Sequence, residues 1–441
     1  MPALRSFFAV VLFSTQLHAY SVLTHEAIID SSWDHEIKPL LLSRYPKATE
    51  DELVRAHASA YGGCIIQDAG YYPFGSTFFS DLVHYVRTGD YIVNQIREAH
   101  TLNELAFALG SLAHYAADTQ GHGIAVNPTV ALEYPKLARK YGKAVTYADD
   151  KTSHMRVEFS FDVVEVAKGN YAPKAYHDFI GFEVEKELME RAFLRTYSLK
   201  LSDVFGDLDL ALGTYRRAVS VLIPQMTRIA WHLKKDELAA THQTAIVTRR
   251  QFVYNLSRAD YRKEWKGSYR EPGIGTRILA FLIRILPKVG PLKALSFHPP
   301  TPQAMNLFET SFNRTLAEYR RLLGDERAKR LTLDDRDFDT GQPTKPCEYI
   351  LADETYAKLA RHLAKVDRAT IDPELLRNVL DFFPDTTLPC FSRIPKDKWK
   401  DTLPALEILK SPADPVKPPT STKPPTSTTS TSTKSPTETR P

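Results

Sequence analysis

The stretch TLNELAFALGSLAHYAADTQGH, residues 101–122, constrains the fold more than any other part of this 441-residue chain. Thr101 and Glu104 form the pattern of a capping box, and leucines then recur at helical spacing. Similar spacing returns in later segments, whereas the alternation typical of strands is scarce. The sequence therefore predicts a mostly α fold, built as a multi-helix bundle.

Composition limits the class of protein only loosely. Hydrophobic residues make up 43% of the chain and charged residues 25%, which is typical of a globular protein with a real core. The formal net charge is +4. This mild basicity is compatible with an anionic substrate, but it is too weak to indicate nucleic-acid binding by itself.

The N-terminus has the pattern of a secretory signal peptide. A single positive charge precedes the short apolar run FFAVVLF, and a small residue follows at Ala19. The apolar run is too short to span a bilayer. We therefore expect residues 1–19 to be removed, leaving a secreted or periplasmic, possibly membrane-associated protein that begins at Tyr20. Leu17 stands where a small residue is preferred, so the exact cleavage position stays open.

The rest of the chain divides by composition into three parts. Residues 20–236 read as the main helical domain, and residues 237–404 as a helical extension of unknown role with Pro-rich loops. From 405 to 441 the chain is rich in Pro, Ser and Thr and lacks apolar residues to bury, which predicts a disordered tail. Within the extension, helices are expected at 302–330, 353–366 and 373–382.

One segment of the extension, residues 276–295, is strongly apolar with interspersed basic residues. Such a segment can lie in a membrane interface, which predicts a possible peripheral membrane contact. Its short length, and the breaks at Pro287 and Gly290, favour a core helix followed by a loop. Both readings stay open from the sequence.

The chain has three cysteines. Cys347 and Cys390 lie near each other in the C-terminal part and could pair, which would leave Cys64 free. An odd number of cysteines keeps other pairings open. Cysteine is too sparse here for a zinc–thiolate site.

The same helix that constrains the fold carries a possible metal site. His114 and Asp118 are four residues apart, so on a helix they share one face, and both are suitable zinc ligands. His122 follows at the same spacing, but Gly121 and Gly123 flank it and predict that the helix ends there. Taken alone, the triplet is weak evidence for a metal, because an isolated histidine and aspartate at this spacing usually form a hydrogen-bonded surface pair.

Further histidines and carboxylates strengthen the metal interpretation. They precede and follow the triplet in short clusters, one of which again has the spacing of one helical turn. The members are His25, Asp68, His84, and the pair His154 and Glu158. Asp162 lies one turn beyond and could replace or support Glu158. The remaining histidines have no partner at ligand spacing, and we expect them on the surface or in ordinary hydrogen bonds.

In this order, the residues resemble the zinc-dependent phospholipase C family, whose superfamily also contains zinc-dependent single-strand nucleases. The nearest resemblance is to the branch with the phospholipase C-like domain of glycosylphosphatidylinositol-specific phospholipase D, where three residues likewise separate the aspartate from the second histidine. The resemblance covers about residues 20–235. It implies a helical bundle that encloses a zinc cluster, with residues 20–236 as the catalytic domain.

The resemblance also implies two or three Zn²⁺ ions and their ligands. The implied ligands are Asp68, His84, His114 and Asp118 for a first ion, His122, His154 and Glu158 for a second, and His25, shared Asp118 and the amine and carbonyl of Tyr20 for a third. The family commonly has Trp where this chain has Tyr20, and the mature terminus lies closer to the first histidine than in the bacterial toxins. Both departures concern the third ion.

The activity implied by the resemblance is hydrolysis of phospholipids, or of another phosphodiester, by a metal-activated water. Asp68 is then the catalytic residue that orients or deprotonates the water, whereas Glu158 is a ligand only. The aromatic residues between two of the ligands could bind acyl chains, stack nucleobases or simply pack in the core; they are Tyr71, Tyr72, Phe74, Phe78 and Phe79.

Two other functions remain as alternatives. One is a zinc-dependent single-strand nuclease or nucleotidase that uses the same ions, and the other is a zinc-stabilised binding module without turnover. The mild basicity, the absence of a nucleic-acid-binding motif and the ligand spacing favour phospholipid, which makes nucleic acid the less expected partner.

Overall fold

The computed structural model describes residues 21–168, 170–171, 180–224, 226–227, 229–230 and 296–411. The predicted signal peptide, Tyr20 and the apolar segment 276–295 lie outside these residues. Within them every regular element is helical, and the only extended pairing is an isolated bridge between Arg336 and Pro343. The prediction of a mostly α fold is confirmed.

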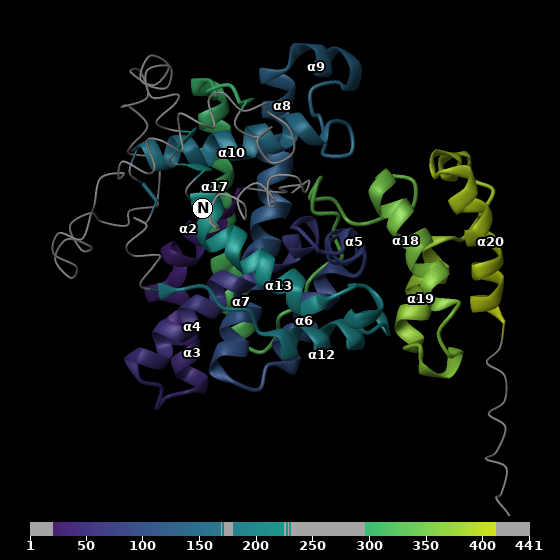
Figure 1. Ribbon diagram of the computed structural model, residues 1–441, viewed down its shortest axis with the longest axis horizontal. Coiled ribbons are helices and arrows are strands. Elements are labelled where there is room, and N and C mark those ends of the chain that lie inside the picture. The colour runs from purple at the N-terminus through teal and green to yellow at the C-terminus, as the bar shows by residue number, and fades with distance from the viewer. Residues whose placement is uncertain are drawn as a thin grey trace, which may run out of the picture.

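The helices of the first part surround one buried helix (Figure 1). In chain order, the elements of this part are α2 (Val22–Ser32), η1 (Trp33–Ile37), α3 (Lys38–Arg44), α4 (Glu50–Gly63), η2 (Ile66–Tyr71), α5 (Thr77–Tyr85), α6 (Thr88–Glu98), α7 (Leu102–Gly121), η3 (His122–Val126), α8 (Asn127–Glu133), α9 (Pro135–Tyr141), α10 (Lys151–Lys168), α12 (Lys186–Tyr197), η4 (Leu201–Asp203), α13 (Leu208–Arg217) and η5 (Ala218–Leu222). The second part comprises α17 (Pro302–Arg327), α18 (Ile350–Leu363), η8 (Arg368–Thr370), α19 (Pro373–Phe382), η9 (Pro389–Arg393) and α20 (Lys396–Lys410).

The central helix α7 begins where the sequence predicts. The Thr101 side chain accepts a hydrogen bond from the Glu104 amide, although the Glu104 carboxylate accepts from the His100 amide rather than completing the box on Thr101. Helices α4 and α17 pack along α7. A Cβ atom at Gly110 would lie 2.2 Å from the carbonyl oxygen of Ala60 on α4, so only glycine allows this close approach.

The C-terminal end of α7 differs from the expectation. α-Helical bonding stops at Gly121, but the backbone continues through the wider π-helical turn η3 into α8 instead of ending. The His122 amide still donates to the Asp118 carbonyl. The helical course of the backbone therefore continues past His122, and the glycines on either side of it do not end the helix.

The C-terminal part packs on the first part. Helix α17 lies against α7, and the Tyr319 hydroxyl donates to the Leu109 carbonyl oxygen at 2.8 Å. Helices α18, α19 and α20 stand together at one side of the molecule (Figure 1). A disulfide joins Cys347 to Cys390 within this group, and Cys64 is free and buried, as the sequence suggested.

Several boundaries in the C-terminal part need correction. Helix α17 ends at Arg327 rather than 330, and α18 spans Ile350–Leu363 rather than 353–366. Helix α20 was not expected. Helix α20 runs through Pro404 to Lys410, so the expected disordered tail does not begin at 405. The reason is that Ala405, Leu406 and Leu409 have helical spacing and bury their side chains.

Residues 412–441 lie outside the described residues, and so does the tail prediction for them. Among the helices that the structure describes, none combines the length and the apolar character needed to cross a bilayer.

Candidate metal centre

The structure brings eight of the nine predicted ligand residues together at the centre of the bundle. They come from α2, η2, α5, α7, η3 and α10, and none is more than 3% exposed. These residues are His25, Asp68, His84, His114, Asp118, His122, His154 and Glu158. Tyr20, the ninth, lies outside the described residues.

The converging residues form two groups, and Asp118 lies at the middle of the first, which also contains His25, Asp68, His84 and His114. The Oδ2 atom of Asp118 lies 3.0 Å from His114 Nε2 and 3.8 Å from His84 Nε2, and its Oδ1 lies 3.5 Å from His25 Nε2. Asp68 Oδ1 lies 3.3 Å from His84 Nε2. The ring of His25 stacks on that of His114 with centroids 4.6 Å apart. Two sets of three ligand atoms within 4.8 Å of one another result, one from His25, Asp68 and His114 and one from His84, His114 and Asp118.

Hydrogen bonds to backbone carbonyls orient the histidines of this group. His84 Nδ1 donates to the Ser80 carbonyl at 2.7 Å, and His114 Nδ1 donates to the Cys64 carbonyl at 3.0 Å. A carbonyl oxygen can only accept, so each Nδ1 carries the proton and each Nε2 keeps its lone pair. Both Nε2 atoms point into the cluster and have no hydrogen-bond partner. This is how metal-binding histidines are usually held.

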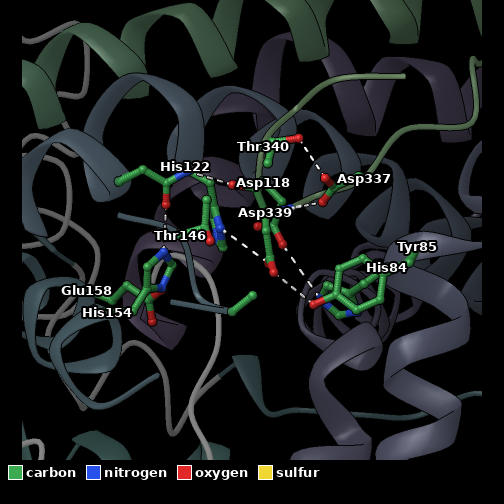
Figure 2. A network of polar contacts seen from close by, with 12 residues as sticks. His84, Tyr85, Asp118, His122, Thr146, His154, Glu158, Asp337, Asp339 and Thr340 are labelled. Atoms are coloured by element: carbon green, nitrogen blue, oxygen red, sulfur yellow. Dashed lines mark hydrogen bonds and ion pairs between the residues drawn. The ribbon is translucent and has the colours of Figure 1, made fainter. Parts of the chain in front are cut away.

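The His154 side of the centre is oriented through Asn127. The Asn127 amide nitrogen donates to the Asp339 carbonyl at 2.7 Å, which turns its oxygen toward His154 Nε2 at 2.8 Å. His154 Nε2 is therefore the protonated nitrogen. Its Nδ1 lies 2.7 Å from Glu158 Oε1, and neither atom has a hydrogen-bond partner. The rings of His122 and His154 are 5.0 Å apart (Figure 2).

Buried polar atoms without a hydrogen-bond partner are concentrated here. Both carboxylate oxygens of Asp118 and of Glu158, and both ring nitrogens of His122, are in this state. Leaving such an atom unsatisfied in the interior costs roughly 1–3 kcal/mol. Nitrogen and carboxylate oxygen are the donors that Zn²⁺ accepts, so the residues present fit zinc.

The pKa values of the cluster reflect burial among like and unlike charges. Burial, helped by repulsion from His114, lowers the pKa of His25 to about 3. Burial opposes ionisation of Asp118, yet the neighbouring His114 holds the Asp118 pKa well below its ordinary value. Burial also opposes protonation of His84, but its ion pair with Asp68 raises the His84 pKa to about 9.

Burial is the largest cause of the pKa shifts in the other groups of the centre. It lowers the pKa of His122 and, further, that of His154. It raises the pKa of Asp68 and, strongly, that of Glu158. Neutral imidazoles keep lone pairs available for a cation, and a cation would stabilise the carboxylates in their charged form.

One residue of the centre was missed by the sequence reasoning. Asp339 is fully buried, and its Oδ1 lies 3.5 Å from His122 Nδ1 (Figure 2). Its Oδ2 accepts hydrogen bonds from the Tyr85 hydroxyl at 2.9 Å and from the Tyr349 hydroxyl. The assignment stopped near residue 235 with the family resemblance. The acidic run DDRDFD, residues 334–339, was the available signal.

Asp162 does not replace Glu158. Its carboxylate accepts hydrogen bonds from the amides of Leu23 and Thr24 and from the Thr24 hydroxyl, at 2.7–3.1 Å. It thus caps the start of α2, the helix that carries His25. Burial raises the pKa of Asp162 to about 7.

The aromatic residues next to Asp68 belong mainly to the core. Four of them are at most 4% exposed: Tyr71, Tyr72, Phe78 and Phe79. Phe74 differs, with 49% of its surface exposed. Core packing is therefore the confirmed reading for four of the five. His57 likewise has an ordinary role, because its Nε2 lies 3.0 Å from Asp30 Oδ1 and its ring stacks on Trp33.

Comparison with known proteins agrees with the geometry. Residues 24–206 match the family model described as zinc dependent phospholipase C. No curated protein and no solved structure matches the chain. The matched range contains the eight converging residues and leaves out Asp339. Residues 24–206 are thus similar to the zinc-dependent phospholipase C family, and the match covers less than half of the chain.

Proposed function

We propose that the chain is an exported zinc-dependent phosphodiesterase that hydrolyses phospholipids in the manner of a phospholipase C. The match to the family model supports the metal and the substrate class. The observation that carries the proposal is the convergence of buried imidazole nitrogens and carboxylate oxygens. Among them, His84, His114 and His154 have their other nitrogen fixed by a hydrogen bond.

The ligand sets follow the two sides of the centre. Asp68, His84, His114 and Asp118 would hold one ion, and His122, His154 and Glu158 a second. His25 and Asp118 would contribute to a third. Zinc bound at such a site lowers the pKa of a water molecule toward neutrality and neutralises phosphate oxygens in the transition state.

Asp68 is the proposed catalytic residue. Burial raises the pKa of Asp68, which makes its carboxylate a stronger base, and its Oδ1 faces His84. It would orient the attacking water and accept its proton. The water oxygen forms a bond to phosphorus, and the phosphorus–oxygen bond to the glycerol breaks. The departing alkoxide takes up a proton, so the products are diacylglycerol and a phosphorylated head group.

Metal content and substrate choice test this function together. We expect the purified secreted protein to contain about two or three zinc ions per chain by elemental analysis. We also expect it to hydrolyse phosphatidylcholine vesicles faster than single-stranded DNA. A preference for DNA would favour the nuclease alternative, and a protein that contains zinc but turns over neither would favour a binding module. A protein without zinc would contradict the proposal.

An Asp68→Asn variant tests the assigned role. Because Asp68 is also a proposed ligand, zinc affinity and turnover are measured separately. With zinc at saturating concentration, the variant should still lose turnover by roughly 10²–10⁴-fold, the usual contribution of a general base. Asp34→Asn is the matched control, because Asp34 is exposed on η1 and should leave both quantities unchanged. Equal turnover in the two variants would remove Asp68 from the mechanism.

Export has a specific chemical consequence in this proposal. The amine of Tyr20 would become a ligand only after signal-peptide cleavage, since an α-amine with a pKa near about 8 loses its proton readily to a metal. His25 would lie on the same ion, so that the cytoplasmic precursor would lack the complete centre. A mature chain with one extra residue before Tyr20 should lose zinc and activity. Full zinc content and activity in that protein would refute this role.

A further inference from the structure

We propose that Asp339 is an additional zinc ligand and shares an ion with His122. The residue comes from the C-terminal part of the chain, outside residues 24–206 that match the family. The inference rests on the zinc centre of the proposed function. It extends that centre to a segment to which sequence analysis gave no role.

The distance between the two side chains is that of two ligands of one ion. Zinc binds imidazole nitrogen and carboxylate oxygen at about 2.0–2.2 Å, so two ligand atoms at a tetrahedral ion lie roughly 3.3–3.5 Å apart. His122 Nδ1 and Asp339 Oδ1 are 3.5 Å apart and form no hydrogen bond. The pair His84 and Asp68, which belongs to the family's ligand set, has the equivalent atoms 3.3 Å apart.

The other carboxylate oxygen of Asp339 is already occupied. The hydroxyls of Tyr85 on α5 and Tyr349 both donate to Oδ2. These two bonds fix the plane of the carboxylate and direct Oδ1 toward His122 (Figure 2). Oδ1 is buried and has no hydrogen-bond partner, which is costly for a carboxylate unless a cation binds it.

The segment around Asp339 contacts the residues of the centre through hydrogen bonds and one aromatic contact. The Phe338 amide donates to the His84 carbonyl at 3.1 Å, and the Phe338 ring lies 5.3 Å from the His84 ring. The Asp339 amide donates to Asp337 Oδ1 at 2.9 Å. Asn127, which orients His154, donates to the Asp339 carbonyl. Asn127 therefore contacts both Asp339 and His154, and Phe338 holds the same segment against His84.

The first test is the metal content of an Asp339→Asn variant. Asparagine keeps the shape of the side chain and can still accept from the tyrosines, but it loses the charge. We expect the affinity for one zinc ion to fall by about 10–100-fold in a chelator competition, so that tightly bound zinc decreases by one ion per chain. Asp334→Asn is the matched control, because Asp334 lies on the same segment with its side chain 72% exposed.

Stability with and without metal separates a ligand from a structural residue. If Asp339 binds zinc, Asp339→Asn should raise the melting temperature in EDTA, because an uncompensated buried charge is removed, and should lower the gain in melting temperature on adding Zn²⁺. A purely structural role predicts the same loss with and without metal. That result, or zinc affinity equal to that of the Asp334→Asn control, would overturn the proposal.

A cysteine at the same position gives a direct signal. In Asp339→Cys loaded with Co²⁺, a thiolate ligand should add charge-transfer absorption in the near ultraviolet that the Co²⁺-loaded wild type lacks. A folded, cobalt-loaded variant without this absorption would contradict direct ligation. The wild-type zinc content distinguishes the two proposals: absent zinc contradicts the metal centre itself, whereas normal zinc in both wild type and Asp339→Asn contradicts only the role of Asp339.

Discussion

The family-matched part and the C-terminal part of this protein both place carboxylates at the same centre, but on different kinds of backbone structure. In residues 24–206, the ligand residues sit on helices or helical turns, at spacings readable in the sequence. In the C-terminal part, Asp339 sits on an irregular segment between α17 and α18. Helical spacing thus identifies ligands in the first part, whereas contacts with neighbouring elements place Asp339.

The two parts also differ in what stabilises them. The first part buries many ligand atoms without a hydrogen-bond partner, and a bound cation would compensate for them. Helices α18 to α20 have a disulfide and close aromatic contacts, including Tyr356 stacked on Phe382 with centroids 3.7 Å apart. We infer that metal removal and disulfide removal weaken different regions, and the following predictions test this difference.

The largest effect is expected from removal of metal. Zinc at 1,000 times its dissociation constant stabilises a protein by about 4 kcal/mol per site, and that contribution is lost with a chelator. EDTA should therefore lower the melting temperature strongly in calorimetry. Hydrogen exchange should show the greatest loss of protection in α7 and α10. Uniform loss across α18 to α20 as well would mean that the two parts unfold as one unit.

A somewhat smaller effect is expected from Gly341→Ala. Gly341 has φ +70°, and a Cβ atom there would lie 2.2 Å from the Thr119 carbonyl oxygen on α7. Backbone strain and overpacking together should cost about 2–4 kcal/mol, measured by denaturant unfolding. The control is Gly324→Ala in α17, where nothing lies within 4 Å. Alanine there should stabilise by about 0.5–1 kcal/mol.

The Gly341→Ala variant also tests whether the packing of this segment on α7 matters for zinc binding. Displacement of this segment should reduce zinc binding, because Asp339 lies two residues away. Normal zinc content in a destabilised variant would show that the segment only covers the centre.

Loss of the disulfide is expected to be comparable in energy but confined to one region. The double variant Cys347→Ser, Cys390→Ser should lower the free energy of unfolding by about 2–4 kcal/mol. Because the bond lies within the C-terminal helices, zinc content should be nearly normal. A large loss of zinc in the double variant would mean that the disulfide positions Asp339 through Tyr349.

The smallest effect concerns the pH dependence of stability at the contact between Asp335 and the start of α6. Burial, with repulsion from Asp90, raises the pKa of Asp335 to about 6, above the ordinary value of 3.8. The folded state therefore binds more protons than the unfolded state between about pH 4 and 6. The contribution of Asp335 to stability is full below this range and is lost as the pH rises through it.

Asp335→Asn should remove that part of the slope. Asparagine can still accept from the Gly89 and Asp90 amides, which bond to Asp335 Oδ1 in the wild type. Denaturant unfolding at several pH values from 4 to 7 should show the wild type losing stability relative to the variant as the pH rises. A constant difference between the two proteins would mean that Asp335 keeps its ordinary pKa.

Much of the centre could be predicted because it depends on local spacing. His114 with Asp118, and His154 with Glu158, are pairs one helical turn apart, and such pairs share a face wherever the helix packs. His25, Asp68 and His84 carry no such local signal, and the order of residues in a known family indicated them. Helix α20 was missed and the start of the tail at 405 was wrong, because Pro404 was taken as a boundary, whereas buried residues beyond it continue the helix.

Sequence alone determined the helical class and the ligands that lie on regular helices, because helical periodicity and the i, i+4 relation are properties of the local backbone. Only the tertiary structure decided that Asp162 caps α2, that His154 is oriented through Asn127, and that Asp339 faces His122 from 217 positions further along the chain. These contacts join segments far apart in sequence, and their geometry arises only when α17 packs on α7 and brings the following segment to the centre.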